Sequence, residues 1–253
     1  MMGAVATPDP VVLLHGFAGT GATWDPVRRR LGPATALQTP DLPGHGTVAG
    51  VRPVSFDACV DTVLACAPPR FVLGGYSLGG RVALHVALAA AGRVSALVLV
   101  STTAGIADDA ERADRRTADG LLADAIQRDG LAAFSERWTA QPLFADDPPD
   151  AVTAQRTEIA RQTPDGLAAA LRGIGTGAMA PLWERLPELT MPVQVVAGER
   201  DAKFTELGDR LVAALSDARL VVVPGAGHGL PREAPGAVAR VIARVGGAAP
   251  QAP

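Results

Sequence analysis

The stretch VLGGYSLGGRVAL, residues 72–84, places Ser77 between glycines at the end of an apolar run. A strand that ends in a serine and leads directly into a helix is the context of a nucleophile elbow. Such a turn forces the serine into a strained backbone conformation, and Gly75 and Gly79 would let the neighbouring segments approach closely. The pattern therefore predicts that Ser77 is a reactive residue. An ordinary turn rich in glycine and serine is the alternative.

Further apolar runs on either side of this stretch are typical of the buried strands of a parallel sheet. With the elbow strand included, the runs are VVLL (11–14), RFVLGG (70–75), SALVLVS (95–101), VQVVAG (193–198) and RLVVVP (219–224). Segments with helical periodicity lie between them, at 55–67, 78–91, 205–215 and 232–244. This alternation predicts an α/β fold in which helices flank a mostly parallel central sheet.

The strand pattern disappears between residues 104 and 190. This segment has the pattern of several helices, broken at QPLF, DDPPD and QTPDG. A helical insertion between two strands is suited to cover the carboxyl edge of the sheet, where open α/β sheets bind ligands. We therefore expect a first core segment at 1–103, an all-helical cap at 104–190 and a second core segment at 191–253.

An elbow serine needs a histidine to accept its proton and an acid to orient that histidine, in the chain order serine, acid, histidine. His228 lies in PGAGHGL after the last predicted strand, and Asp201 lies in AGERDAKF after the preceding one. Glu199 is the alternative acid. Because loops that follow neighbouring parallel strands meet at one sheet edge, we expect Ser77, Asp201 and His228 to form a catalytic triad.

The other three histidines, His15, His45 and His85, have no metal-ligand spacing with a third partner, so the sequence predicts no metal site. We expect them to brace the backbone or to pack. The segment HGF after the first strand has a different use, since its backbone N–H at Phe17 can point at a developing negative charge. Together with the N–H of Leu78 it is expected to form an oxyanion hole.

Composition excludes several classes of partner. The formal net charge is -3, and the isoelectric point near 5.8 does not suggest a nucleic-acid binder. No apolar stretch approaches the ~18 to 20 residues of a membrane-spanning helix, which argues against a membrane partner. The stretch MMGAVATPDPVV lacks the basic and apolar regions of a secretory signal. A cytoplasmic location and a monomeric state are therefore the default expectations.

Several motifs carry a resemblance to a known family. HGF, DLPGHG, GYSLGG, GERD and GAGH are together landmarks of the α/β-hydrolase fold. VLGGYSLGGRVAL, AERADRR (110–116), RWTAQPLF (137–144) and GERDAKF (198–204) resemble the 2-succinyl-6-hydroxy-2,4-cyclohexadiene-1-carboxylate synthases, the MenH family. The resemblance covers both the sheet portion and the predicted cap.

The resemblance implies a lyase that uses no cofactor. Such an enzyme removes a proton from 2-succinyl-5-enolpyruvyl-6-hydroxy-3-cyclohexene-1-carboxylate, and the resulting anion expels pyruvate. It implies that Ser77 acts as the base, made basic by His228 and Asp201. The N–H groups of Phe17 and Leu78 would then stabilise an enolate-like oxygen, because both chemistries develop negative charge on oxygen.

The implied substrate carries several carboxylates, which the planar fork of arginine binds well. Arg81 follows Ser77 by four residues, which places both on one helical face, one turn apart. The resemblance adds four further substrate-binding candidates: Arg115, Arg161, Trp138 and Tyr76. Arg116 is the alternative to Arg115.

The sequence departs from the family at two places. Pro231 stands where many members carry a second histidine, and STTAG (101–105) lacks the SPG that often opens the cap. Two alternatives to the lyase therefore stay open. One is a hydrolase acting on an ester, thioester or carbon–carbon bond of an anionic small molecule, and the other is a non-catalytic ligand receptor on the same fold.

Overall fold

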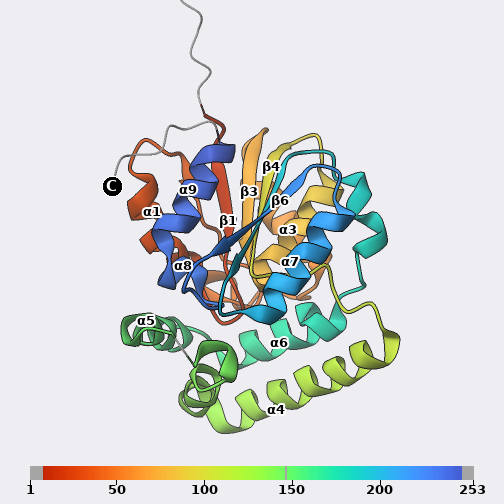
Figure 1. The fold of residues 1–253 in the computed structure, drawn as a ribbon. Helices are drawn as coiled ribbons and strands as arrows, with labels where there is room; N and C mark the ends of the chain where they lie inside the picture. Colours follow the sequence, from red (N-terminus) through yellow and green to blue (C-terminus); the bar gives the residue numbers. More distant parts are fainter. Residues whose placement is uncertain (1–7, 146, 247–253) are drawn as a thin grey trace, which may run out of the picture.

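The computed structural model describes residues 8–145 and 147–246. Its centre is a six-stranded, fully parallel sheet with the strand order β2-β1-β3-β4-β5-β6 (Figure 1). The strands are β1 (Val11–Leu14), β2 (Leu37–Gln38), β3 (Phe71–Tyr76), β4 (Val94–Val100), β5 (Val193–Gly198) and β6 (Ala218–Val223). All five predicted strands are confirmed, and β2 is an addition. The expectation that the chain has no secretory signal concerns mainly the stretch before residue 8, which lies outside the described residues.

The central strands are buried on both faces, and successive side chains along a strand pack alternately into two separate cores. Val12 and Leu14 of β1 pack with one group of helices, and Val11 and Leu13 pack with the other. The first group comprises α2 (Phe56–Cys66), α3 (Leu78–Ala89) and α7 (Ala202–Ala214). The second comprises α1 (Asp25–Leu31), α8 (Leu230–Glu233) and α9 (Pro235–Val245) (Figure 1). The predicted α/β architecture with helices on both faces is confirmed.

Between β4 and β5 the chain forms the longer helical elements α4 (Asp109–Thr139), α5 (Pro149–Ile159) and α6 (Pro164–Ile174). A kink divides α4 at Gly130, where the backbone is non-helical, with φ 80° and ψ 177°, and the sequence did not predict this break. They lie together across the carboxyl edge of the sheet (Figure 1). Their own apolar cluster includes Ile126, Phe134 and Leu167, and it reaches the core at Ala18. The helical character and the predicted breaks of this segment are confirmed, whereas its status as a separate cap stays a prediction.

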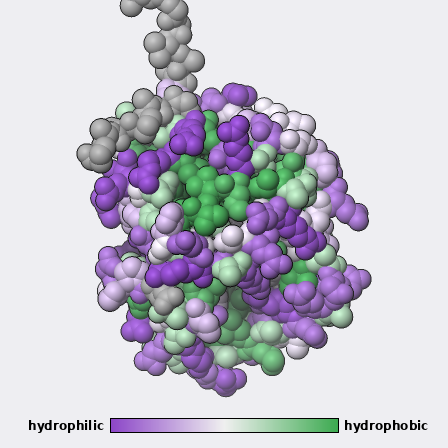
Figure 2. All heavy atoms as spheres, in the orientation of Figure 1, coloured by the Kyte–Doolittle hydropathy of each residue, from purple (hydrophilic) through white to green (hydrophobic). Residues whose placement is uncertain are grey.

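The strand β6 forms one edge of the sheet and pairs with β5. Figure 2 shows an apolar area over this edge, in the middle of the face that is turned to the viewer. Val222 is the large apolar side chain of β6 that is well exposed. Within residues 8–145 and 147–246, no helix is both long and apolar enough to cross a membrane.

Candidate active site

Ser77 occupies the sharp turn between β3 and α3, where its backbone adopts φ 52° and ψ -109°. A positive φ is rare for a residue with a side chain and marks local strain. The turn closes because its neighbours lack side chains. A Cβ on Gly75 would lie 2.2 Å from the carbonyl oxygen of Gly79, and a Cβ on Gly79 would lie 2.2 Å from that of Leu14. The sequence pattern of an elbow therefore corresponds to the geometry of one.

The predicted triad residues lie within hydrogen-bond distance of one another. Nε2 of His228 is 3.3 Å from Oγ of Ser77, and Nδ1 of His228 is 2.7 Å from Oδ2 of Asp201. Asp201 and His228 are both buried. Glu199, the alternative acid, is exposed and accepts the N–H of Gly225 at 2.8 Å. The geometry selects Asp201, with Nδ1–H donating to its carboxylate and Nε2 left to accept the proton of Ser77.

Two backbone N–H groups border the space next to Ser77. Leu78 is the first residue of α3, and the first N–H groups of a helix have no acceptor within the helix. Phe17 follows β1 and lines the same cavity as Leu78. The backbone approaches closely here, because a Cβ on Gly16 would lie 3.6 Å from Cβ of Ser77. The position of Phe17 and Leu78 is compatible with an oxyanion hole, and that role stays a prediction.

The remaining histidines lie in packing or bracing positions. His15 is buried; its Nε2 accepts the N–H of Leu42 at 3.0 Å, and burial lowers its pKa. His45 is buried against His15, and burial lowers its pKa to about 3. His85 stacks on Phe56, and burial lowers its pKa to about 4. Among the described residues, no group of His, Cys, Asp or Glu side chains is arranged to hold a metal ion.

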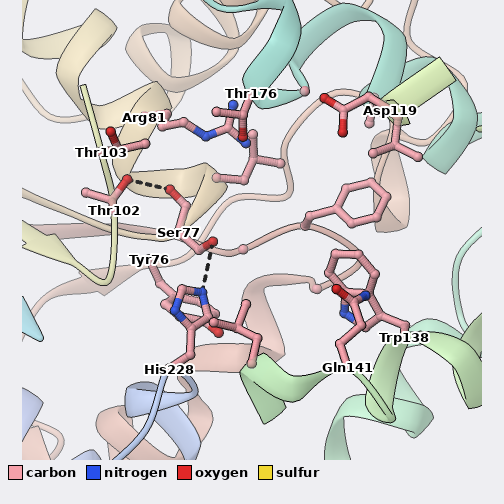
Figure 3. Close-up of a pocket in the computed structure, with 18 of the residues that line it drawn as sticks. Tyr76, Ser77, Arg81, Thr102, Thr103, Asp119, Trp138, Gln141, Thr176 and His228 are labelled. Atoms are coloured by element: carbon pink, nitrogen blue, oxygen red, sulfur yellow. Dashed lines mark hydrogen bonds between the residues drawn. The ribbon is translucent and has the colours of Figure 1, made fainter. Parts of the chain in front are cut away.

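A cavity of about 480 Å³ lies over Ser77, between the carboxyl edge of the sheet and the helices α4 to α6. Arg81, Thr102 and Thr103 lie on one side of Ser77, and His228 and Trp138 lie on the other (Figure 3). The cavity wall thus combines a cationic, hydroxyl-bearing side with an aromatic side. A small polar ligand with an anionic group fits this distribution.

Arg81 is a buried cation in the cavity wall, with only 7% of its surface exposed. Its Nη1 donates to the carbonyl oxygen of Ile174 at 2.8 Å. Burial and, secondly, the positive charge of Arg115 lower the pKa of Arg81 to about 10, so that it is still protonated at neutral pH. The ion pairs found among residues 8–145 and 147–246 do not include Arg81. A buried, charged guanidinium without a carboxylate partner is suited to bind an anion.

Arg115 enters the cavity wall from α4. Its Nε donates to Oδ1 of Asp119 at 2.7 Å, one helical turn further on. Asp119 is itself buried, and its other oxygen accepts the N–H of Gly177 at 3.2 Å. Arg116 instead donates to the carbonyl oxygen of Gly177 at 3.1 Å. Of the two arginines that the sequence left open, Arg115 is the one at the cavity.

The comparisons with known proteins agree with this geometry. The model of the family described as "Alpha/beta hydrolase family" matches residues 11–241. A putative 2-succinyl-6-hydroxy-2,4-cyclohexadiene-1-carboxylate synthase from Bacillus subtilis is 36% identical and aligns with 92% of this chain and 89% of its own. The chain belongs to this synthase family of α/β hydrolases. A synthase of the same name from Salmonella newport is 33% identical over 97% of this chain and 96% of its own.

Solved structures lead to the same family. The structure of MenH from S. aureus superposes with a TM-score of 0.88 at 30% identity and covers 95% of this chain and 94% of its own. A thermophilic esterase from Thermogutta terrifontis, solved with malate bound, superposes with a TM-score of 0.80 at 28% identity, over 94% of this chain and 89% of its own. The synthase fold is therefore shared with hydrolases that act on other substrates.

Two aromatic residues expected from the synthase family lie at the site. Trp138 lines the cavity, with its ring centroid 5.2 Å from that of Phe17. Tyr76 lies beneath His228, with the ring centroids 5.5 Å apart, and burial raises the pKa of Tyr76. Both positions allow contact with a ligand above Ser77.

Arg161 requires a correction. The resemblance to the synthase family placed this residue at the substrate, but the structure places it outside the cavity, exposed beyond the end of α5. It borders a separate surface depression together with Arg29 of α1. The reason is local: Glu158 in the last turn of α5 and Gln162 directly after Arg161 take the buried positions, which leaves the side chain of Arg161 at the surface.

The structure adds cavity residues that sequence reasoning missed. Arg232 lines the cavity and its Nη2 donates to Oε1 of Glu158 at 2.8 Å, and both side chains are 7% exposed. Arg232 follows His228 by four residues, the spacing that singled out Arg81 after Ser77. That spacing is a signal that could have found it. Asp119 gave a similar signal, since it follows Arg115 by four residues on a predicted helix.

Proposed function

We propose that this protein removes a proton from 2-succinyl-5-enolpyruvyl-6-hydroxy-3-cyclohexene-1-carboxylate and eliminates pyruvate. The product is 2-succinyl-6-hydroxy-2,4-cyclohexadiene-1-carboxylate, an intermediate of menaquinone biosynthesis. Relatives named for this product, at 33% to 36% identity over nearly the whole chain, support the proposal. The structural observation that carries it is Arg81: a buried guanidinium, one helical turn from Ser77, without a carboxylate partner among the described residues.

In the proposed reaction, Ser77 is the group that takes the proton from the substrate. Nε2 of His228 accepts the hydroxyl proton of Ser77, and Asp201 stabilises the imidazolium that forms. The abstracted proton lies next to the succinyl carbonyl, so the electron pair first moves onto that carbonyl oxygen. The N–H groups of Phe17 and Leu78 would stabilise this enolate.

Collapse of the enolate forms a ring double bond between C2 and C3, moves the existing double bond from C3–C4 to C4–C5, and breaks the bond from C5 to the oxygen of the enolpyruvyl group. The leaving group departs as the enolate of pyruvate and takes up the proton held by the triad. Water is not consumed and no electron acceptor is needed. This balance agrees with the expectation from the sequence that the enzyme uses no cofactor, which stays a prediction.

The arginines would supply binding energy for the carboxylates of the substrate. Arg81 offers donors beside Ser77, and Asp119 holds Arg115 by its Nε atom, leaving the two terminal nitrogens of Arg115 to bind. Trp138 and Tyr76 would form the apolar wall against the ring. We propose that the helices α4 to α6 act as the cap that excludes water from the reaction.

A hydrolase is the second candidate, because the triad geometry also suits attack of Ser77 on a carbonyl carbon. The structural similarity to an esterase, at a TM-score of 0.80, supports the hydrolase as a second candidate. It predicts an acyl-enzyme on Ser77 with a cognate ester or thioester. The monomeric state and the cytoplasmic location stay predictions for either candidate.

A reaction in water labelled with ¹⁸O separates the two candidates. Elimination gives a ring product with no oxygen from water, and its mass equals that of the substrate less pyruvate. Hydrolysis gives a product that retains one oxygen from the solvent. A labelled ring product, or an acyl adduct on Ser77 during turnover, would replace the lyase assignment by the hydrolase one.

A further inference from the structure

The carboxylate of Glu233 holds the backbone on both sides of His228. It accepts the N–H of Gly227 at 2.8 Å and the N–H of Gly229 at 2.7 Å, one with each oxygen. Its side chain is only 3% exposed. Charge-assisted hydrogen bonds of this kind are about twice as strong as neutral ones. This one carboxylate therefore holds the backbone directly before and directly after His228.

Glu233 also connects the histidine loop with the loop of the triad acid. Nη2 of Arg200 donates to Oε2 of Glu233 at 3.2 Å, and Arg200 directly precedes Asp201. A second link runs through the backbone, where the N–H of Arg200 donates to the carbonyl oxygen of Ala226 at 2.9 Å. The segments that carry Asp201 and His228 are thus tied together at Glu233, behind the reacting atoms.

The same short helix, α8, contacts the helical segment at two points. Arg232 pairs with Glu158 of α5, as described above. Glu233 contacts Asp147, which lies in the stretch just before α5. The two carboxyl groups meet over Gly229: a Cβ there would lie 3.1 Å from Oδ2 of Asp147 and 3.1 Å from Oε1 of Glu233.

Two carboxyl groups in contact do not both ionise without a cost, so one of them keeps a proton. Asp147 is the one with the perturbed pKa. Burial, followed by the negative charge of Glu233, raises the pKa of Asp147 to about 7, while Arg232 and Arg200 act in the opposite direction. Both oxygens of Glu233 already accept an N–H group beside His228, so we assign the shared proton of the pair to Asp147.

We propose that Glu233 is a positioning residue for His228 and that protonated Asp147 docks the helical segment onto it. The docked arrangement places Phe144, three residues before Asp147, with its ring centroid 5.9 Å from that of His228. The position of the segment over the cavity is then coupled to the position of the histidine. This proposal rests on the proposed function in one respect: the docked form is the one that catalyses the reaction.

The direction of the pH effect follows from the charges. Below about pH 7, the proton on Asp147 lets the two carboxyl groups share a hydrogen bond. As the pH rises through this range, Asp147 ionises, two negative charges face each other, and the docked form loses its advantage. The positively charged groups that face the pair are Arg200 and Arg232.

The test is a ¹³C NMR titration of the carboxyl groups in the full-length protein, from about pH 5 to about pH 9. The Asp147 signal is identified by its loss in Asp147→Asn. We expect it to titrate near pH 7, and the backbone N–H signals of Gly227 and Gly229, which donate to Glu233, to show an inflection over the same range. In Glu233→Gln the Asp147 midpoint should fall, because the neighbouring negative charge is removed. Asp150→Asn, an exposed acid on α5, is the matched control and should leave both curves unchanged.

An Asp147 midpoint below about pH 5, or N–H signals of Gly227 and Gly229 that do not follow Asp147, would overturn the proposal. Neither observation requires substrate, so the outcome does not depend on whether pyruvate is released. Kinetics add an independent readout. For the wild-type protein kcat/KM should fall above about pH 7, and in Asp147→Asn this decline should disappear, because the amide donates to Glu233 at every pH. An unchanged decline in Asp147→Asn would equally contradict the proposal.

Discussion

Arg81 combines burial, charge and proximity to Ser77. Its guanidinium is one turn along α3 from Ser77, and one of its N–H groups donates to the carbonyl oxygen of Ile174. Taking a guanidinium out of water costs free energy, which an incoming carboxylate offsets. Since burial lowers the pKa of Arg81 to about 10, anion binding should weaken as the pH rises through that value, where the cation is lost.

Replacing Arg81 by alanine should lower kcat/KM for pyruvate release on the order of 100-fold, which corresponds to about 3 kcal/mol of lost binding to a buried charge. Arg81→Lys should recover only part of this loss, because lysine lacks the bidentate fork. Steady-state kinetics on the three proteins measure both effects. Activity of Arg81→Ala close to that of the wild type would remove the main physical reason for a polycarboxylate substrate.

Arg161 gives the opposite prediction. Because its side chain lies on the surface beyond α5 and outside the cavity, Arg161→Ala should change kcat/KM by less than about threefold. The measurement is the same assay. A large loss of activity would mean that this arginine reaches the substrate in a conformation different from the one described.

At the scale of the element, the elbow depends on how closely three backbone segments approach. The glycines 75 and 79 are identifiable in the sequence because a strand, a serine and a helix follow one another with no loop between them. The long strands and the breaks of the helical segment are predictable for a similar reason, since apolar runs and proline clusters are local signals. In contrast, β2 has two residues and α1 has seven, and neither is long enough to show a period.

Gly79→Ala should destabilise the protein by about 3 kcal/mol or more, because its Cβ would overlap the carbonyl oxygen of Leu14. Thermal unfolding should show a melting temperature lower by about 5 to 10 °C. Gly120→Ala is the matched control in α4, where nothing lies within 4 Å of the added Cβ. It should raise stability by up to about 1 kcal/mol, since alanine favours a helix. Equal effects of the two substitutions would contradict the close packing of the elbow.

At the scale of the whole molecule, the site lies where two kinds of structure meet. The parallel sheet brings Ser77, Asp201 and His228 to one edge, and α4 adds Arg115 and Trp138 from the other side. The triad was predictable because strand order dictates which loops converge. The orientation of Arg161 was not, because it depends on how α5 rests on the core through Glu158 and Gln162. The place of Arg232 in the cavity wall depends on the same packing, because its partner Glu158 lies 74 residues away in sequence.

The proposed chemistry uses only groups of the chain itself. Prolonged dialysis against a chelator should therefore leave kcat and KM for pyruvate release unchanged within experimental error. The comparison is between dialysed protein and the same protein supplemented with divalent metal ions. Loss of activity on dialysis, restored by one metal, would show that a metal takes part in the reaction.

Release of pyruvate from verified 2-succinyl-5-enolpyruvyl-6-hydroxy-3-cyclohexene-1-carboxylate is the decisive measurement, with the ring product quantified in the same reaction. We expect the wild-type protein to release one pyruvate for each molecule of 2-succinyl-6-hydroxy-2,4-cyclohexadiene-1-carboxylate formed. Ser77→Ala should lower the rate by at least about 10³-fold, because the proton acceptor is lost. Absence of pyruvate with the wild-type protein, or undiminished release by Ser77→Ala, would contradict the assignment.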